Sequence, residues 1–240
     1  MNMDFRSQAQ PLGISIDISE IMRRVYLWML GGLSITALVA FGIAQSGLWA
    51  TIATNPLLLI VVIIAQFGLV IAITARIEKM SPATAGWLFA AYSALMGVTM
   101  SFIFLVYTGA DIAIAFVATA AMFGAMSIVG YTTKVDLSKV GSILFMALIG
   151  LIIASVINIF FFSDTLYWII NYAGVLIFTG LTAWDTQKIK RMASEVSVRD
   201  AGEVEVAVGR LAVVGALILY LDFINLFLFI LRIVGRGGRD

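Results

Sequence analysis

Seven stretches of this chain are each long and apolar enough to cross a lipid bilayer as an α-helix. A spanning helix needs about 20 predominantly apolar residues, and the stretches that meet this need are residues 24–45, 55–75, 84–107, 111–132, 141–162, 165–184 and 208–232. Apolar residues make up 62% of the 240 positions and charged residues only 12%, which is too little charge to coat a water-soluble domain. The sequence therefore predicts an all-α integral membrane protein with seven transmembrane helices.

The remaining residues form short connections, two tails and one long polar segment. Residues 1–22 are mixed and polar, without the pattern of a secretory signal, and are expected to form a retained cytosolic tail. Residues 23–234 are expected to form one membrane domain, and residues 235–240 a C-terminal tail. Within the domain, residues 186–207 carry charges of both signs and are expected to form a partly helical cytosolic loop.

The distribution of Lys and Arg predicts how the helices are oriented. Short loops that carry these residues stay on the cytoplasmic side of the membrane. Basic residues precede the first stretch and follow the second, fourth and sixth, whereas the three alternate connections contain none. The N-terminus is therefore expected to be cytoplasmic, and seven crossings would place the C-terminus on the other side.

The C-terminal end conflicts with that parity, because it carries Arg232, Arg236 and Arg239. Two arrangements fit the sequence: a full seventh span, or a re-entrant last segment that returns to the cytoplasmic side. The apolar length of residues 208–232 favours the full span.

The composition also excludes several classes of function. The chain contains no cysteine and no histidine, which excludes thiol nucleophiles and removes the commonest general base and transition-metal ligand. Its net charge of +1 gives no attraction for nucleic acid, and no Gly-rich phosphate loop occurs. We therefore expect no enzymatic activity, no cofactor and no nucleic-acid partner; the expected partner is the lipid bilayer.

Asp222 is the ionisable residue that fits its apolar surroundings least well. It lies near the middle of the last stretch, roughly 15 Å from the basic residues at either end at ~1.5 Å per residue. A charge at this depth costs at least ~2.5 to 3.5 kcal/mol on insertion scales. Asn225 follows three residues later on the same helical face, so this face should not contact lipid. The last helix is therefore expected to be central, although a neutral Asp222 with a purely structural hydrogen bond is an alternative.

Two further ionisable residues lie at the ends of apolar stretches. Asp185 closes the sixth stretch, just before the cations that mark the headgroup region, and Arg76 ends the second stretch. Taken alone, each is typical of an interfacial anchor. Asp185 is expected nearer the cytosolic edge than Asp222, so the two meet only if the sixth helix lies deeper or ends later than its apolar stretch.

Two motifs in the second half of the chain resemble the transmembrane Bax inhibitor motif (Bax inhibitor-1-like) family, in its bacterial branch. They are residues 219–227 (LYLDFINLF) and residues 185–189 (DTQKI), and the likeness extends over the whole chain in helix number and spacing. The resemblance implies seven helices with the last surrounded by the other six, in the bacterial inner membrane, and a pH-dependent calcium leak.

The resemblance also implies roles for individual residues. Asp185 and Asp222 would form a pair that shares a proton or a hydrogen bond, and Arg76 would latch onto Asp185 in the closed state. Asn225, by its position on the same helical face as Asp222, is expected to be a supporting polar residue. The chain departs from the family pattern in its longer loop between the motifs and in the second stretch, where Gln66 is the main polar residue and no acidic residue occurs.

Elementary electrostatics makes such a pair a proton sensor without histidine. Two carboxylates in one low-dielectric pocket do not both ionise cheaply, so they titrate as a unit. Deprotonated, Asp185 and Asp222 would offer hard oxygen ligands to calcium, but calcium prefers six to eight oxygens, so its binding would be transient. The expected function is a pH-sensitive calcium-permeable leak channel gated by Asp185, Asp222 and Arg76.

Three other functions compete with the channel. An intramembrane aspartyl protease lacks its Gly-x-Gly-Asp signature here, and an ion-coupled transporter would be expected to break its helices at mid-membrane, whereas Pro11, Pro56 and Pro82 lie in tails or connections. The main alternative is a noncatalytic modulator of a membrane-anchored quality-control protease, which the family resemblance also suggests.

Overall fold

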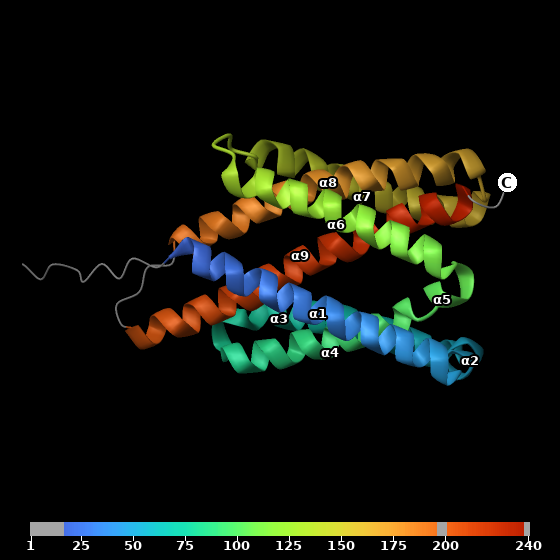
Figure 1. Ribbon diagram of the computed structural model, residues 1–240, viewed down its shortest axis with the longest axis horizontal. Coiled ribbons are helices and arrows are strands. Elements are labelled where there is room, and N and C mark those ends of the chain that lie inside the picture. The colour runs from blue at the N-terminus through green and yellow to red at the C-terminus, as the bar shows by residue number, and fades with distance from the viewer. Residues whose placement is uncertain (1–16, 196–200, 238–240) are drawn as a thin grey trace, which may run out of the picture.

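The computed structural model describes residues 17–195 and 201–237, and all regular secondary structure within them is helical (Figure 1). The elements are α1 (Ile18–Ser46), α2 (Leu48–Thr54), α3 (Pro56–Arg76), the 3-10 turn η1 (Ile77–Lys79), α4 (Pro82–Met100), α5 (Ile103–Val106), α6 (Gly109–Thr132), α7 (Ser138–Phe161), α8 (Asp164–Glu195) and α9 (Ala201–Gly237). In this described part, seven segments are long and apolar enough to cross a membrane. The prediction of an all-α protein with seven transmembrane helices is confirmed.

Local sequence signals set where the spanning helices begin. The side chain of Asn55 accepts a hydrogen bond from a backbone N–H in the first turn of α3, and Pro56 is the first residue of the helix. Ser81 and Pro82 repeat this arrangement at the start of α4. A polar cap satisfies an N–H group that has no partner within the helix, and proline fits there because it has no N–H to lose. The pairs Asn55–Pro56 and Ser81–Pro82 therefore mark the starts of α3 and α4 in the sequence itself.

The C-terminal helix α9 is the centre of the bundle. It packs against α1, α4, α6 and α8, and 72% of its most apolar stretch is buried, against 44% for α8 and 6% for α7. Figure 1 shows α9 running diagonally between the layer of α6, α7 and α8 and the layer of α1, α3 and α4. The predicted central position of the last helix is confirmed.

The same helix decides between the two arrangements left open for the C-terminal end. α9 is one continuous helix of 37 residues, and it runs from the end of the bundle where α1 begins to the opposite end (Figure 1). It therefore has the geometry of a full span and not of a re-entrant segment. Its described part ends at Gly237, so Arg239 lies outside the described residues.

The outer helices present apolar side chains outward. On α3, Leu57, Ile64 and Phe67 are exposed, and on α7, Phe160 and Phe161 are exposed. Exposed side chains of this kind would be unfavourable in water but are suited to the hydrocarbon of a bilayer, where the helical backbone satisfies its own hydrogen bonds.

Both helices that flank the long polar segment extend further than their apolar stretches indicate. α8 continues to Glu195 and α9 begins at Ala201, so most of residues 186–207 is helix; residues 196–200 lie outside the described residues. Ile189 and Ala193 are buried and continue the inward face of α8 beyond its apolar stretch at helical spacing. The helix therefore follows its packing surface and does not stop where its hydropathy falls. Similarly, α1 begins at Ile18, within the expected tail; residues 1–16 and 238–240 are outside the described part.

Charged contacts join the helices at the end where α1 begins and α8 ends. Arg24 pairs with Glu205 of α9 at 2.6 Å, and Arg191 pairs with Asp136 of the α6–α7 connection at 2.9 Å. In addition, Arg210 Nε donates a hydrogen bond to the carbonyl of Met80 (2.7 Å), which ties α9 to the turn after η1. These contacts involve exposed or half-buried groups, so each contributes modestly to stability.

Candidate functional site: a carboxylate pair beside the central helix

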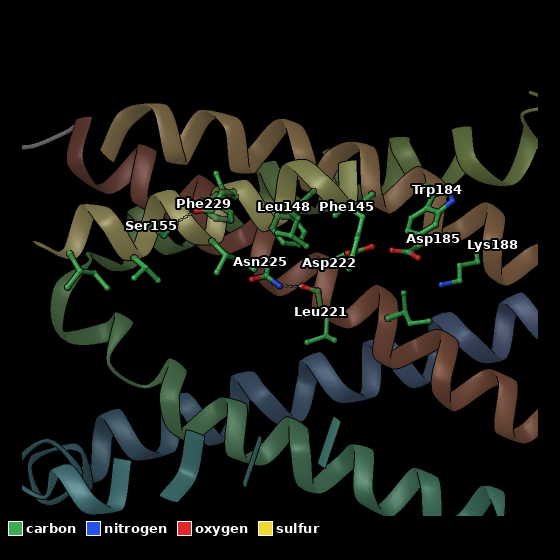
Figure 2. Close-up of a pocket in the computed structure, with 17 residues that line it drawn as sticks. Phe145, Leu148, Ser155, Trp184, Asp185, Lys188, Leu221, Asp222, Asn225 and Phe229 are labelled. Atoms are coloured by element: carbon green, nitrogen blue, oxygen red, sulfur yellow. Dashed lines mark hydrogen bonds between the residues drawn. The ribbon is translucent and has the colours of Figure 1, made fainter. Parts of the chain in front are cut away.

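Asp185 of α8 and Asp222 of α9 point toward each other in the interior of the bundle (Figure 2). Their exposed fractions are 7% and 5%, and the two carboxyl groups lie close enough to interact directly. The structure thus brings together the two aspartates that the motifs single out. The sixth helix ends later than its apolar stretch, because α8 continues to Glu195, so Asp185 lies well inside a helix and not at its end.

The two aspartates line one cavity between α7, α8 and α9, with a volume of about 570 Å³. Apolar side chains make up most of its wall, and its polar groups come from Ser155, Asp185, Lys188, Asp222 and Asn225. The side chain of Asn225 donates a hydrogen bond to the carbonyl of Leu221, one helical turn earlier (2.8 Å, Figure 2). The predicted polar face of the last helix, Asp222 with Asn225, therefore faces this cavity.

Helix α8 is held closely on both sides just before Asp185. Gly130 of α6 lies against the backbone carbonyl of Ala183, and Gly141 of α7 lies against the ring of Trp184. A side chain on either glycine would overlap these atoms, so the absence of a Cβ is what permits the approach. Such close contacts between small residues replace the hydrophobic drive that is missing between helices in lipid, and here they fix the position of Asp185.

Helix α9 is held by a buried tyrosine two residues before Asp222. The Tyr220 hydroxyl hydrogen-bonds to the hydroxyl of Thr36 on α1 at 2.6 Å, and the Thr36 hydroxyl also donates to the backbone of α4 at Ser93. The ring of Tyr220 packs edge-on against Phe89, with 5.6 Å between the ring centres. Because this anchor points toward α1 and α4, it sets the rotation of α9 that turns Asp222 toward α8.

One oxygen of the pair lacks a hydrogen bond. Asp222 Oδ2 is buried and has no hydrogen-bond partner within the described part of the chain. A buried carboxylate oxygen without a donor is costly. Chemically, the site can therefore accept a proton or a small cation at this atom.

Lys188 is a residue of the site that the sequence reasoning missed. It was interpreted as one of the cations marking the headgroup region, but its side chain lines the cavity and acts electrostatically on both Asp185 and Asp222. Its ammonium group lies 5.1 Å from the centre of the Trp184 ring, a favourable cation–π distance. The signal available in the sequence was the helical spacing, since Lys188 follows Asp185 by three residues.

Arg76 does not take part in the site as the structure shows it. It is exposed at the end of α3, it is not among the residues that line the cavity, and no ion pair joins it to a carboxylate within residues 17–195 and 201–237. Helix α3 packs chiefly against α4, through a hydrogen bond from Gln66 to the carbonyl of Leu95 (2.8 Å) among others. The latch between Arg76 and Asp185 therefore stays a prediction, and it would require α3 to move.

A second, smaller polar cavity adjoins the first toward the other end of the bundle. Its volume is about 170 Å³, and it shares Ser155 and Ile159 with the carboxylate cavity. Asn171 is 1% exposed and Arg232 is half-buried, and both line this cavity. Polar side chains thus continue along the α7–α8–α9 contact beyond the aspartate pair, and sequence hydropathy gave no sign of Asn171.

The described residues contain no group of three or more acidic, histidine or cysteine side chains that would hold a metal ion. A cation in the cavity would therefore meet two carboxylates, a few neutral oxygens and the positive charge of Lys188, which is far weaker ligation than a tight calcium site provides.

The fold and the two motifs agree with the comparisons to known proteins. A family model described as "Inhibitor of apoptosis-promoting Bax1" matches residues 18–239. The chain belongs to this family. The match confirms the resemblance of residues 185–189 and 219–227 to the Bax inhibitor-1-like family and extends it to nearly the whole chain.

Individual relatives support the bacterial branch of the Bax inhibitor-1-like family. The inner membrane protein YbhL of Escherichia coli (strain K12) is 51% identical over 220 residues, which cover 91% of this chain and 92% of that protein. A protein of Borreliella burgdorferi is 45% identical over 223 residues (92% and 94%), and one of Deinococcus radiodurans is 40% identical over 217 residues (90% and 90%). The names of these three relatives specify no ion and no activity.

Proposed function

We propose that this chain is a pH-sensitive calcium-permeable leak channel whose gate is the pair Asp185 and Asp222. The observation that carries the proposal is the convergence of both carboxyl groups in one cavity beside the central helix. An isolated intramembrane carboxyl group would fit a structural role equally well. Two that face each other form a site whose charge depends on protons.

Protonation would act on the contact between α8 and α9. When the pair holds one proton, one carboxyl group can donate to the other, and the buried oxygen of Asp222 gains a partner. When both groups are ionised, two negative charges face each other in a medium of low dielectric and repel strongly. That repulsion favours either separation of the two helices or entry of a cation between them, so proton release and ion entry would be coupled.

Calcium suits such a site as a passing ion. The cavity offers hard oxygen atoms from Asp185, Asp222, Asn225 and Ser155, and water would complete the six to eight ligands that calcium prefers. Conduction needs binding that is favourable enough for entry and weak enough for exit. A site with two carboxylates and few further ligands meets that condition better than a closed acidic cage.

The membrane and its sidedness belong to the same proposal. We place the chain in a bacterial inner membrane, as the name of the Escherichia coli relative states for that protein, with its N-terminus in the cytoplasm because the basic connections lie at that end. In this role the chain needs no catalytic residues and no cofactor.

Calcium flux into liposomes tests the proposal directly. The purified full chain is reconstituted with an internal calcium dye, and flux is measured between about pH 5 and pH 8 for the wild type, Asp185→Asn and Asp222→Asn. The wild type should show a flux that depends on pH, and both variants should lose most of that dependence because an amide cannot exchange the proton. Glu203→Gln, an exposed position at the start of α9, is the matched control and should behave as the wild type.

The opposite result is equally clear. A chain that inserts correctly but carries no calcium at any of these pH values would overturn the channel proposal. The noncatalytic modulator of a membrane-anchored protease would then become the better explanation of the family membership.

A further inference from the structure

A long apolar groove runs between α1 and α6, on the side of α9 opposite the carboxylate cavity. Its volume is about 820 Å³. Met29, Leu30 and Leu33 of α1 line one wall, and Phe116 and Ala120 of α6 line the other. Figure 1 shows α9 passing behind these two helices.

Aromatic rings close the bottom of the groove. Phe223 of α9 packs edge-on against Phe116 and Phe123, with ring centres 5.7 and 5.5 Å apart. The ring of Phe223 therefore closes the inner side of the groove between α1 and α6. The groove is therefore a one-sided recess that opens toward the surrounding membrane.

The mouth of the groove differs chemically from its depth. Ser19, Arg23 and Thr132 line it at the end where α1 begins. The side chain of Arg23 is 65% exposed; its Nε and Nη2 atoms donate to Glu20, while Nη1 makes no hydrogen bond within the described residues. Lys190 adds a second positive charge beside the mouth, because its ammonium group donates to the carbonyl of Tyr131 at 2.7 Å.

One buried hydroxyl lies between the polar mouth and the apolar depth. Ser127 lines the groove, is 6% exposed, and its hydroxyl has no hydrogen-bond partner within the described part of the chain. Serine and threonine in helices usually donate to the carbonyl four residues earlier, as Ser155 and Thr119 do here. The Ser127 hydroxyl therefore has a hydrogen bond left to make at the wall of the groove.

We propose that this groove binds one glycerophospholipid of the leaflet next to the α1 start. Its phosphate would lie at Arg23, a glycerol ester carbonyl would accept the hydrogen bond of Ser127, and one acyl chain would run along the apolar walls. A phosphodiester oxygen can accept from the Nη1 group that Arg23 has left after pairing with Glu20, and Lys190 adds positive charge beside it. An ester carbonyl can accept a hydrogen bond from the buried hydroxyl, which a hydrocarbon cannot do.

The dimensions of the groove agree with this occupant. From Thr132 to Ser127 is about 7 Å along α6, and from Thr132 to Phe116 is about 24 Å, at ~1.5 Å per residue. The first length suits the step from a phosphate to an ester carbonyl. The remaining length is comparable to one leaflet of hydrocarbon, about 15 Å.

Glycine 124 offers a clean way to fill the groove. Gly124 lines it, and a Cβ built on this residue meets no other atom within 4 Å, so Gly124→Leu can extend a side chain into the groove without a clash at its Cβ. Gly150 on α7 is equally open but lies outside the groove, which makes Gly150→Leu the matched control. Ala120→Phe fills the groove one turn away and serves as a second variant should Gly124→Leu fold poorly.

The test is native mass spectrometry of the full chain, purified from vesicles of phosphatidylethanolamine and phosphatidylglycerol. The wild type and Gly150→Leu should each retain one phospholipid when the detergent is stripped, and Gly124→Leu and Ala120→Phe should retain it several-fold less often. Arg23→Gln should also lower retention, and diacylglycerol, which lacks the phosphate, should not replace the phospholipid. Equal retention by Gly124→Leu and Gly150→Leu, or equal retention of diacylglycerol, would overturn the proposal.

Discussion

Gly130 of α6 lies directly against the backbone carbonyl of Ala183 on α8, two residues before Asp185. The contact is between backbones, so neither side can yield by rotating a side chain. Gly141 faces the ring of Trp184 on the other side of α8. The two contacts together fix the position of α8 along the bundle, and with it the level at which Asp185 meets Asp222. The geometry of the carboxylate pair therefore depends on Gly130 of α6 and Gly141 of α7, two uncharged residues that do not line the cavity.

We predict that Gly130→Ala destabilises the protein. The added methyl group would overlap the Ala183 carbonyl, and overpacking of this kind typically costs about 1 to 3 kcal/mol. Gly124→Ala on the same helix has open space and should be neutral or slightly stabilising, since alanine is the better helix former by about 1 kcal/mol. Thermal unfolding in detergent measures both, and equal melting temperatures for the two variants would contradict the role given to Gly130.

Much of this fold could be predicted because the bilayer restricts what a chain can do. Its thickness sets the length of each span, so the apolar stretches locate the seven crossings. Asp222 and Asn225, three residues apart, predict that the last helix avoids lipid, and α9 is the most buried of the spans. The end of α8 could not be predicted in the same way, because Ile189 and Ala193 extend its packing beyond the apolar stretch.

Asp136 gives a prediction of pH dependence outside the membrane. Its carboxylate accepts a hydrogen bond from the backbone N–H of Ser138 (2.9 Å) and pairs with Arg191 (2.9 Å). These interactions, the Ser138 hydrogen bond first, hold the pKa of Asp136 well below its usual range. Because the folded pKa is lowered, the stabilisation is complete above the ordinary aspartate pKa of about 4 and is lost as the pH falls through the lowered value.

Asp136→Asn should therefore lower the melting temperature at pH 7 and pH 5 by a similar small amount, since the pair is exposed. Below about pH 4 the difference from the wild type should shrink. Glu203→Gln, which removes an exposed carboxylate at the start of α9, should show no such trend. A difference that persisted unchanged to pH 3 would show that the charge of Asp136 is not what stabilises the α6–α7 connection.

Lys188 should tune the proton sensor. Its positive charge favours the ionised form of the neighbouring carboxyl groups, so in Lys188→Met the pair should keep its proton to a higher pH. The profile of calcium flux against pH should move upward by about one unit or less, because the lysine is exposed and exposed charge pairs contribute about 1 kcal/mol at most. Lys139→Met, an exposed cation at the start of α7, should leave the profile in place. Identical profiles for both variants would remove Lys188 from the site.

The composition of the site could be predicted only in part, and the reason is the same for each residue that was missed or misplaced. Motif position identifies Asp185 and Asp222, because both interrupt or border an apolar stretch. Motif position gives no information on tertiary contacts. For this reason the sequence indicates a headgroup anchor at Lys188 and gives no indication that Asn171 lines a cavity. Arg76 shows the converse, since its motif position implies a contact with Asp185 that the packing of α3 on α4 does not provide here.

The latch assigned to Arg76 therefore gives a prediction about movement. If α3 swings toward α8 in the closed state, Arg76→Ala should raise the calcium flux several-fold at the pH where the wild-type channel is closed, because an ionised Asp185 would lose its counter-charge. Lys79→Ala removes a cation from the neighbouring turn η1 and should leave the flux unchanged, which separates the latch from a general loss of positive charge at this end of the bundle. An unchanged or lower flux in Arg76→Ala would rule out the latch.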